Sequence, residues 1–242
     1  MSGEEVWRVL GIAAVPASVR PLLQAAARVG RQREVPVYAV GGCVRDWLLR
    51  IPSLDIDLVV EGDGVAYARA LGAAMKARIV EHGAFGTATL TCADKRRIDV
   101  ATARTERYRQ PAAYPSVEPG SIEQDLGRRD FTINAMAIRL GMGKSLMVVD
   151  PCGGRGDLEA RHIRALHVGS FMDDPTRIFR AARFAQRFGF AIEPMTERWI
   201  REAVRAGMLE RVQRGRVRKE LVRMADEPSP WACVQRLVDL VA

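Results

Sequence analysis

The stretch VYAVGGCVRDWLLRIPSLDIDLVV, residues 37–60, decides the fold of this chain. It begins with a short β-branched run, turns at Gly41 and Gly42, continues in a helical pattern and ends in an alternating segment. Glycines that follow a strand let backbone N–H groups approach a phosphate at a helix start, and Arg45 adds positive charge there. The stretch predicts strand, glycine turn, helix and strand, in which the turn either binds phosphate or only needs glycine for its backbone.

The second of these strands presents two carboxylates on one face. Residues 54–60 alternate, so that Asp55 and Asp57 point away from the apolar side that begins with Leu54. Carboxylates at this spacing can bridge two divalent metal ions about 4 Å apart, the arrangement used for nucleotidyl transfer. The alternative is a solvated strand face with two chance acids. Asp99, in another predicted strand, either completes a carboxylate trio or forms a surface ion pair.

The rest of the chain predicts a mixed α/β part followed by a helical part. We expect one domain over residues 1–168, a mixed sheet with helices packed on one side, and an all-helical domain over residues 169–242. Within the first domain the patterns predict helices over 19–29, 65–78 and 128–140, strands over 86–92, 96–100, 146–149 and 163–166, and a loop over 105–124.

Composition describes a globular chain with an excess of positive charge. The 242 residues are 48% hydrophobic and 27% charged, with a net charge of +8. An excess of this size favours an anionic partner such as nucleic acid, nucleotide or membrane surface. From Asp173 to Met224 there are thirteen Lys and Arg against seven Asp and Glu, so +6 of the total lies in that helical segment.

Cysteine and histidine usage excludes two common kinds of site. Cys43, Cys92, Cys152 and Cys233 lie far apart without a CxxC pair, and the chain has three histidines. A disulfide framework or a zinc site is therefore not expected, and a reducing, cytoplasmic location fits best. No signal-peptide pattern and no apolar run of roughly 18 residues is present, so we expect no membrane association.

One predicted helix carries a stripe of arginines. At 100° per residue Arg177, Arg180, Arg183 and Arg187 fall within an arc of about 120°, with apolar residues on the other side. The arginines are either solvated on a surface helix or gathered to bind an anion.

Together these motifs resemble the signatures of the bacterial class II tRNA nucleotidyltransferases (CCA-adding enzymes) and poly(A) polymerases. The first signature is GGxVRDxLL with the DxD strand. RRDFTINAMA at 128–137, DPxxGxxDL at 150–158 and DDPTRIFRAARF at 173–184 resemble the second, third and fourth. Residues 215–221 resemble the fifth, with Gly215 where an acid is common, and Asp173 stands where the family usually has Glu.

The resemblance implies a nucleotidyltransferase-fold head, a helical neck and a role for each motif. Asp55 and Asp57 would hold two Mg²⁺ ions, with Asp99 as a third catalytic acid. Asp174 and Arg177 would read the Watson–Crick edge of the incoming base. The implied ligands of the triphosphate and ribose are Gly41, Gly42, Arg45, Arg180 and Arg183 for the former and Arg129 and Asp130 for the latter.

The implied reaction adds C or A residues from CTP or ATP to the 3′ end of tRNA and releases pyrophosphate. A poly(A) polymerase, a CC-only or A-only enzyme, and a nucleotide- or RNA-binding module working with a partner chain are the alternatives. Family members usually continue with a helical body that grips tRNA, whereas this sequence ends at Ala242, soon after the segment that resembles the neck. A homo-oligomer or a partner chain would compensate for that grip, or the basic surface along the neck would bind the RNA backbone weakly.

Overall fold

The computed structural model describes residues 7–10, 15–82, 86–141 and 146–242, which divide into two compact units. The sheet unit comprises Met1–Thr105, Val117–Arg129 and Asn134–Gly154, and the helical unit comprises Glu106–Ser116, Asp130–Ile133 and Arg155–Ala242. Segments 106–116 and 130–133 thus pack with the helical unit, although they precede residue 168, where the sequence predicts the domain boundary.

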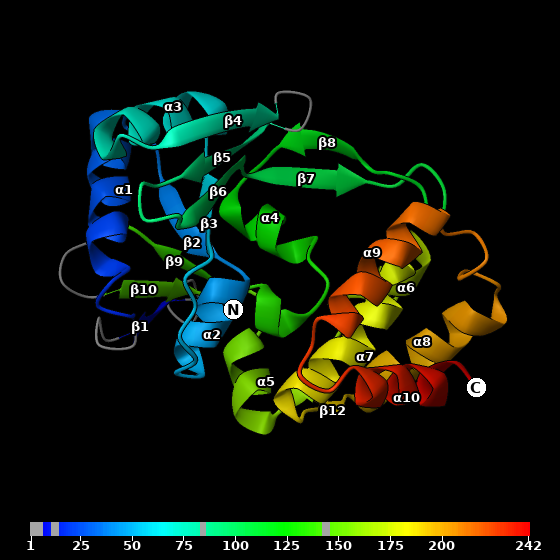
Figure 1. Ribbon diagram of the computed structural model, residues 1–242. Coiled ribbons are helices and arrows are strands. Elements are labelled where there is room, and N and C mark those ends of the chain that lie inside the picture. The colour runs from blue at the N-terminus through cyan, green and yellow to red at the C-terminus, as the bar shows by residue number, and fades with distance from the viewer. Residues whose placement is uncertain (1–6, 11–14, 83–85, 142–145) are drawn as a thin grey trace. The chain divides into compact units, whose positions relative to one another are not determined.

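The sheet unit is built on an eight-stranded mixed sheet (Figure 1). Its strands run in the order β1-β10-β9-β2-β3-β6-β5-β4. Neighbours are antiparallel except for β3 and β6, which are parallel. The bounds are β1 Trp7–Leu10, β2 Val37–Val40, β3 Ile56–Val60, β4 Arg78–His82, β5 Thr87–Thr91, β6 Arg97–Thr102, β9 Ala137–Arg139 and β10 Leu146–Val149.

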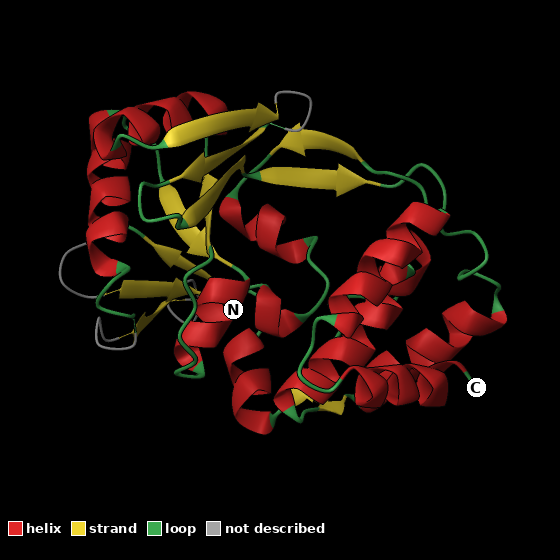
Figure 2. Ribbon diagram, viewed as in Figure 1, coloured by secondary structure: helices red, strands yellow, loops and turns green. Residues whose placement is uncertain are grey.

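Two helices, α1 (Arg20–Gln32) and α3 (Gly64–Met75), pack against each other and against this sheet (Figure 2). In β3 the alternation places Ile56 and Leu58 in the core and leaves Asp57 exposed. The side chain of Asp63 accepts a hydrogen bond from the Ala66 N–H at 2.9 Å and so fixes the start of α3 immediately after β3. The short helix α2 (Gly42–Leu48) follows β2 directly, as the sequence predicts.

The helical unit contains α6 Ser170–Asp173, α7 Thr176–Phe188, α8 Pro194–Arg205, α9 Arg214–Ala225 and α10 Pro230–Val241. Phe179, Met224 and Cys233, from α7, α9 and α10, form its core cluster. The helical prediction is confirmed, with one addition: the short strand β12 (Ala191–Ile192) pairs in parallel with β11 (His162–Ile163). The strand predicted over 163–166 is therefore represented by the two-residue strand β11. The helix α5 (Gly154–Ala160) precedes β11.

The helix predicted over 128–140 is wrong. The structure has a 3-10 helix at Thr132–Asn134 and then strand β9, which pairs with β2 on one side and β10 on the other. Residues 135–138 are completely buried. A short apolar run buried on all sides carries no periodicity that separates strand from helix, and sheet pairing outweighs the helix propensity of Ala and Met.

Two smaller expectations also need correction. The predicted loop over 105–124 contains β7 (Arg104–Arg107) paired with β8 (Ser116–Pro119), and the start of α4 (Ile122–Gly127), which Ser121 and Gln124 cap reciprocally. Leu54 lies before β3 and is 51% exposed, so it is not part of the buried face. No helix in the described ranges is long and apolar enough to span a membrane.

Candidate active site

The parallel pairing of β3 with β6 brings two carboxylates together. Asp57 on β3 stands directly opposite Asp99 on β6, and Asp55 lies just before β3, two residues from Asp57. Because neighbouring strands lie about 4.8 Å apart and residues in register point to the same face, both carboxylates project from the same side of the sheet. The expected orientation of Asp99, away from the buried Ile98 and Val100, is confirmed.

Asp99 is engaged by its neighbours in the sheet. The Thr89 hydroxyl on β5 donates to Asp99 Oδ1 at 2.6 Å, and Arg97 forms an ion pair with Asp99 Oδ2 at 3.0 Å. Asp99 stands beside Asp57, as a third acid of the trio would, and it also forms the ion pair of the alternative prediction.

Asp57 is the acid of this group whose ionised form is disfavoured by its surroundings. Surrounding protein removes part of its hydration, and this desolvation is the largest effect that raises its pKa above the ordinary value. Asp99 and Asp55 raise the pKa further by charge repulsion, while the positive charge of Arg129 opposes them. Beneath it the buried Cys43 thiol has a pKa raised to about 12, by burial first and by the Asp57 charge second, so Cys43 is a neutral packing residue.

Arg129 is held in place from two sides. Its Nη2 donates to Asp125 Oδ2 at 2.9 Å, and its Nη1 donates to the Asn134 carbonyl at 3.5 Å. Asp125 is completely buried, also pairs with Arg128 at 2.6 Å, and keeps a lowered pKa because its two arginine partners outweigh the effect of desolvation. Arg129 Nε is buried without a hydrogen-bond partner among the described residues.

Gly41 makes the approach of Arg129 possible. Its φ of +71° and ψ of −127° favour glycine, and a Cβ there would stand 2.6 Å from Arg129 Nη1. The glycine turn thus has a packing role toward Arg129, beside its predicted role toward phosphate.

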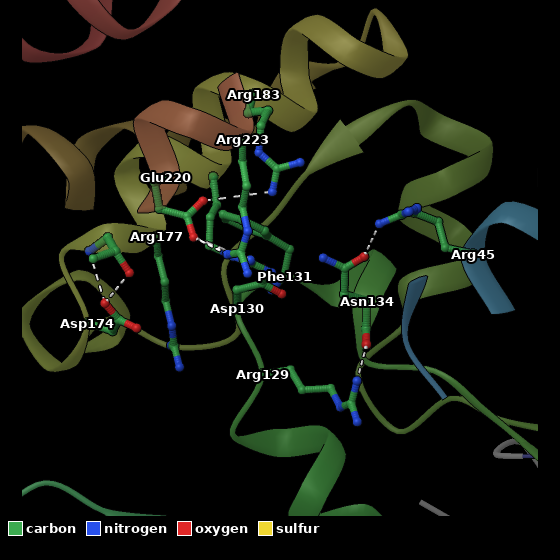
Figure 3. Close-up of polar contacts among 12 residues, drawn as sticks. Arg45, Arg129, Asp130, Phe131, Asn134, Asp174, Arg177, Arg183, Glu220 and Arg223 are labelled. Atoms are coloured by element: carbon green, nitrogen blue, oxygen red, sulfur yellow. Dashed lines mark hydrogen bonds and ion pairs between the residues drawn. The ribbon is translucent and has the colours of Figure 1, made fainter. Parts of the chain in front are cut away.

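Arg45 is buried beside the same turn. Its Nη1 donates to Asn134 Oδ1 at 2.6 Å, and its Nε donates to Asp46 Oδ1 at 2.8 Å. Figure 3 shows Arg45 and Arg129 joined to Asn134 by dashed lines, one through the side chain and one through the carbonyl. Asn134 therefore links Arg45 and Arg129, the two arginines for which the family resemblance implies contacts with the triphosphate and the ribose.

The acidic residues of the sheet unit suit a divalent cation in their chemistry. Carboxylate oxygens are the ligands that Mg²⁺ prefers, and a bound cation would offset the desolvation and the repulsion by Asp99 and Asp55 that raise the pKa of Asp57. Nowhere in the described ranges do three or more His, Cys, Asp or Glu side chains form a ready-made metal cluster. Asp55 and Asp57 consequently fit the predicted ion as donors, while Asp99 is turned toward Thr89 and Arg97.

The helical unit holds the predicted base-reading pair at the start of α7. Asp174 Oδ1 accepts hydrogen bonds from the Thr176 N–H at 3.0 Å and hydroxyl at 2.5 Å, and pairs with Arg216 at 2.6 Å. Arg177 is buried, and its Nη1 donates to the Ser170 hydroxyl at 2.6 Å. Figure 3 shows the Asp174 carboxylate joined by dashed lines to its hydrogen-bond partners and the Arg177 side chain extending beside it.

In the arginine stripe of α7, Arg180, Arg183 and Arg187 pair with acids. Arg180 Nε donates to Asp130 Oδ2 at 2.7 Å; burial opposes its charge, but Asp130 and Glu220 outweigh that effect and raise its pKa. Arg183 pairs with Glu227 at 3.1 Å, and its burial lowers its pKa. Arg177 and Arg183 are buried, so the interpretation of the stripe as solvated is wrong for these two.

Sequence reasoning missed the residues that hold the predicted ligands in place. They are polar and charged side chains that contact the predicted ligands, some from nearby in sequence, as Asp125 contacts Arg129, and some from another element, as Arg216 contacts Asp174. The signal for some was present, since Arg216 and Glu220 belong to the fifth signature and Asn134 to the second. The missed residues are Asp125, Asn134, Ser170, Thr176, Arg216 and Glu220.

The mixed sheet with paired carboxylates is the arrangement expected of a nucleotidyltransferase head. Residues 37–164 match the family model described as the poly(A) polymerase head domain, and residues 189–241 match a model described as a probable RNA and SrmB-binding site of polymerase A. The first match covers more than half of the sequence, and the chain belongs to the poly(A) polymerase head-domain family.

Two curated relatives show what this chain is similar to. An A-adding tRNA nucleotidyltransferase of Geobacter sulfurreducens is 42% identical over 226 residues, which are 93% of this chain and 26% of that protein. A CC-adding tRNA nucleotidyltransferase of Deinococcus radiodurans is 42% identical over 185 residues, 76% of this chain and 48% of that protein. The chain thus spans a quarter to a half of the length of these relatives.

Solved structures agree with the fold. The apo form II of a CCA-adding enzyme superposes with a TM-score of 0.90 at 41% identity, covering 97% of this chain and 56% of that one. The complexes of a CCA-adding enzyme with ATP and with CTP each give a TM-score of 0.87 at 40% identity over 97% of this chain and 55% of that one. The predicted fold class is confirmed.

Replacing Gly41 by alanine tests its contact with Arg129. In Gly41→Ala the new Cβ displaces the guanidinium that lowers the pKa of Asp57, so we expect that pKa, followed by NMR titration of the side-chain carboxyl, to rise further. Gly153→Ala is the matched control, because Gly153 also has φ +71° but nothing lies within 4 Å of its Cβ position. Both variants should lose stability, about 1–2 kcal/mol for the control, but an unchanged Asp57 pKa in Gly41→Ala would contradict the assignment.

Replacing Asp57 by asparagine tests its electrostatic strain. A carboxyl with a raised pKa binds its proton more tightly in the folded chain, so its ionisation lowers stability as the pH rises from the ordinary pKa to the raised one. We expect Asp57→Asn to increase the free energy of unfolding at neutral pH, and the gain to shrink on acidification through that window. Asp94→Asn should instead decrease the free energy of unfolding at neutral pH. The reason is that hydrogen bonds from Arg96 stabilise the ionised Asp94 and hold its pKa below its usual value. Urea unfolding at a series of pH values measures both, and a neutral-pH loss in Asp57→Asn would refute the first.

Proposed function

We propose that this chain transfers nucleotidyl groups from CTP or ATP to the 3′ end of tRNA and releases pyrophosphate. The observation that carries the proposal is the register of β3 and β6, which sets Asp57 opposite Asp99 with Asp55 two residues away. In this reaction the RNA 3′-oxygen forms a bond to the α-phosphorus, and the bond from that phosphorus to the bridging oxygen of pyrophosphate breaks. The relatives named as A-adding and CC-adding tRNA nucleotidyltransferases support the substrate class.

The sheet unit supplies the groups for the chemical step. Asp55 and Asp57 would hold Mg²⁺, with Asp99 as a third acid, and the bound ions would lower the pKa of the 3′-hydroxyl and neutralise the leaving pyrophosphate. The Gly41–Gly42 turn offers backbone N–H groups to phosphate, and Arg45 and Arg129 add charge-assisted donors.

The helical unit supplies the groups that recognise the base. Cytosine and adenine both present an exocyclic amino group beside a ring nitrogen, whereas uracil and guanine present a carbonyl in the corresponding place. The Asp174 carboxylate accepts from that amino group, and Arg177 donates to a ring nitrogen or carbonyl. Asp130 would contact the ribose, and Arg180 and Arg183 the triphosphate; each of the three is held by an ion pair before any nucleotide binds.

The alternatives differ in product and partner. Similarity to A-adding and CC-adding relatives at equal identity leaves full CCA addition, partial addition and poly(A) synthesis as variants of the proposal. A binding module that works with a partner chain is the non-enzymatic alternative, and the metal-binding acids argue against it because binding alone does not require them. We include in the proposal a cytoplasmic location, consistent with four unpaired cysteines, and a homo-oligomer or partner chain that helps to hold tRNA.

Primer-extension on defined tRNA ends tests the reaction. The purified chain is incubated with Mg²⁺ and tRNAs that end before CCA, after C and after CC, each with CTP, ATP or both. Addition of C, A or both in limited number supports the proposal and identifies the variant. Long oligo(A) on generic RNA would move the assignment to poly(A) synthesis, and no incorporation by protein of verified fold would refute the enzyme.

Replacing Asp55 by alanine tests the metal-binding role. Because Asp55 is an exposed acid immediately before β3, we expect Asp55→Ala to abolish incorporation while the free energy of unfolding changes by less than about 1 kcal/mol. Thermal unfolding and the primer-extension assay are run on the same preparation. Loss of the fold would instead indicate a structural role for Asp55, and retained incorporation would exclude it from catalysis.

A further inference from the structure

The two residues proposed to read the base differ in how they are held. Asp174 has three donors on one carboxylate oxygen: the N–H and hydroxyl of Thr176 and the guanidinium of Arg216. Arg177, in the same turn, donates from Nη1 to the Ser170 hydroxyl at 2.6 Å. Ser170 lies at the start of α6 and is completely buried.

The Ser170 contact restrains the direction in which the Arg177 guanidinium faces. A guanidinium is a flat fork of five N–H donors, so a hydrogen bond to one Nη group restricts rotation of the whole plane. A guanidinium whose plane is restrained presents its donors in one direction, as pairing with a base edge requires. The short α6 helix sets the Ser170 position, because the Ser170 carbonyl accepts from the Asp174 N–H at 3.2 Å and thereby ties the two segments together.

We propose that Ser170 is a specificity-determining positioning residue, which orients Arg177 so that the incoming base is selected by its amino and ring-nitrogen edge. The inference rests on the proposed function, since it takes Arg177 to be a base-reading residue. Ser170 itself touches Arg177 and need not touch the nucleotide. Its loss would leave a charged donor that can turn toward carbonyl groups, which uracil and guanine present at this edge.

A merely structural role for Ser170 makes a different prediction. A buried hydroxyl that only satisfies Arg177 would, when removed, lower stability and weaken the binding of every nucleotide by the same factor. A positioning role changes the ratio between nucleotides. Thr196 provides a matched control, because it is also completely buried and hydrogen-bonded, to Glu193 and to the Ala165 N–H, and neither partner is part of the proposed base-reading pair.

Equilibrium binding of the four nucleoside triphosphates to the full 242-residue chain tests the inference without requiring turnover. We expect the unmodified chain to bind CTP or ATP more tightly than UTP and GTP, and Ser170→Ala to reduce that preference by about tenfold, the loss expected for one hydrogen bond to a charged group. Ser170→Thr, which keeps the hydroxyl, should restore the preference. Thr196→Val should lose thermal stability and keep the preference.

The outcomes separate the inference from the proposed function. An unchanged preference in Ser170→Ala, or an equal loss for all four nucleotides, would overturn the role of Ser170. Absence of preference in the unmodified chain would overturn it as well, together with the base-reading assignment. A chain that discriminates among nucleotides in binding but adds none to tRNA would refute the proposed function, while a reduced preference in Ser170→Ala would still support the orientation of Arg177 by Ser170.

Discussion

The parallel pairing of β3 with β6 fixes where the acids of this protein stand. Among the described strands of the large sheet it is the one parallel pair, and its register puts Asp57 beside Asp99. Parallel neighbours cannot be joined by a tight hairpin, so the chain must cross over between them, and α3 with β4 and β5 forms that connection. The helix packs against β3, β5 and β6, while Asp57 on β3 is exposed.

Buried arginine–carboxylate pairs organise the groups around this acidic side and within the helical unit. In the sheet unit Asp125 holds Arg129, whose charge offsets part of the repulsion at Asp57. In the helical unit Asp130 holds Arg180, and Glu227 holds Arg183. An arginine that is already desolvated and oriented loses little freedom when it meets an anion, so within each unit such pairs would favour the phosphate contacts that we propose, at a cost to stability.

The sequence predicted the parts of the fold and site that depend on local pattern. The β2 strand, its glycine turn and the acidic face of β3 follow from residue type and alternation within residues 37–60. The strand β9 could not be predicted in this way, because its identity comes from pairing with β2 and β10, which are distant in sequence. The partners of the α7 arginines could not be predicted either. Helical periodicity shows that Arg177 and Arg183 share a face of the helix, but it does not show that other elements bury that face.

Asp125 is the shared ion-pair partner of two neighbouring arginines, Arg128 and Arg129. It is completely buried, and both Arg128 and Arg129 depend on its single negative charge. Removing the acid would leave two guanidiniums without their buried partner, and breaking a buried ion pair of this kind typically costs about 3–5 kcal/mol. We therefore expect these three residues to vary together among related sequences, so that a substitution at one of them is accompanied by compensating substitutions at the others.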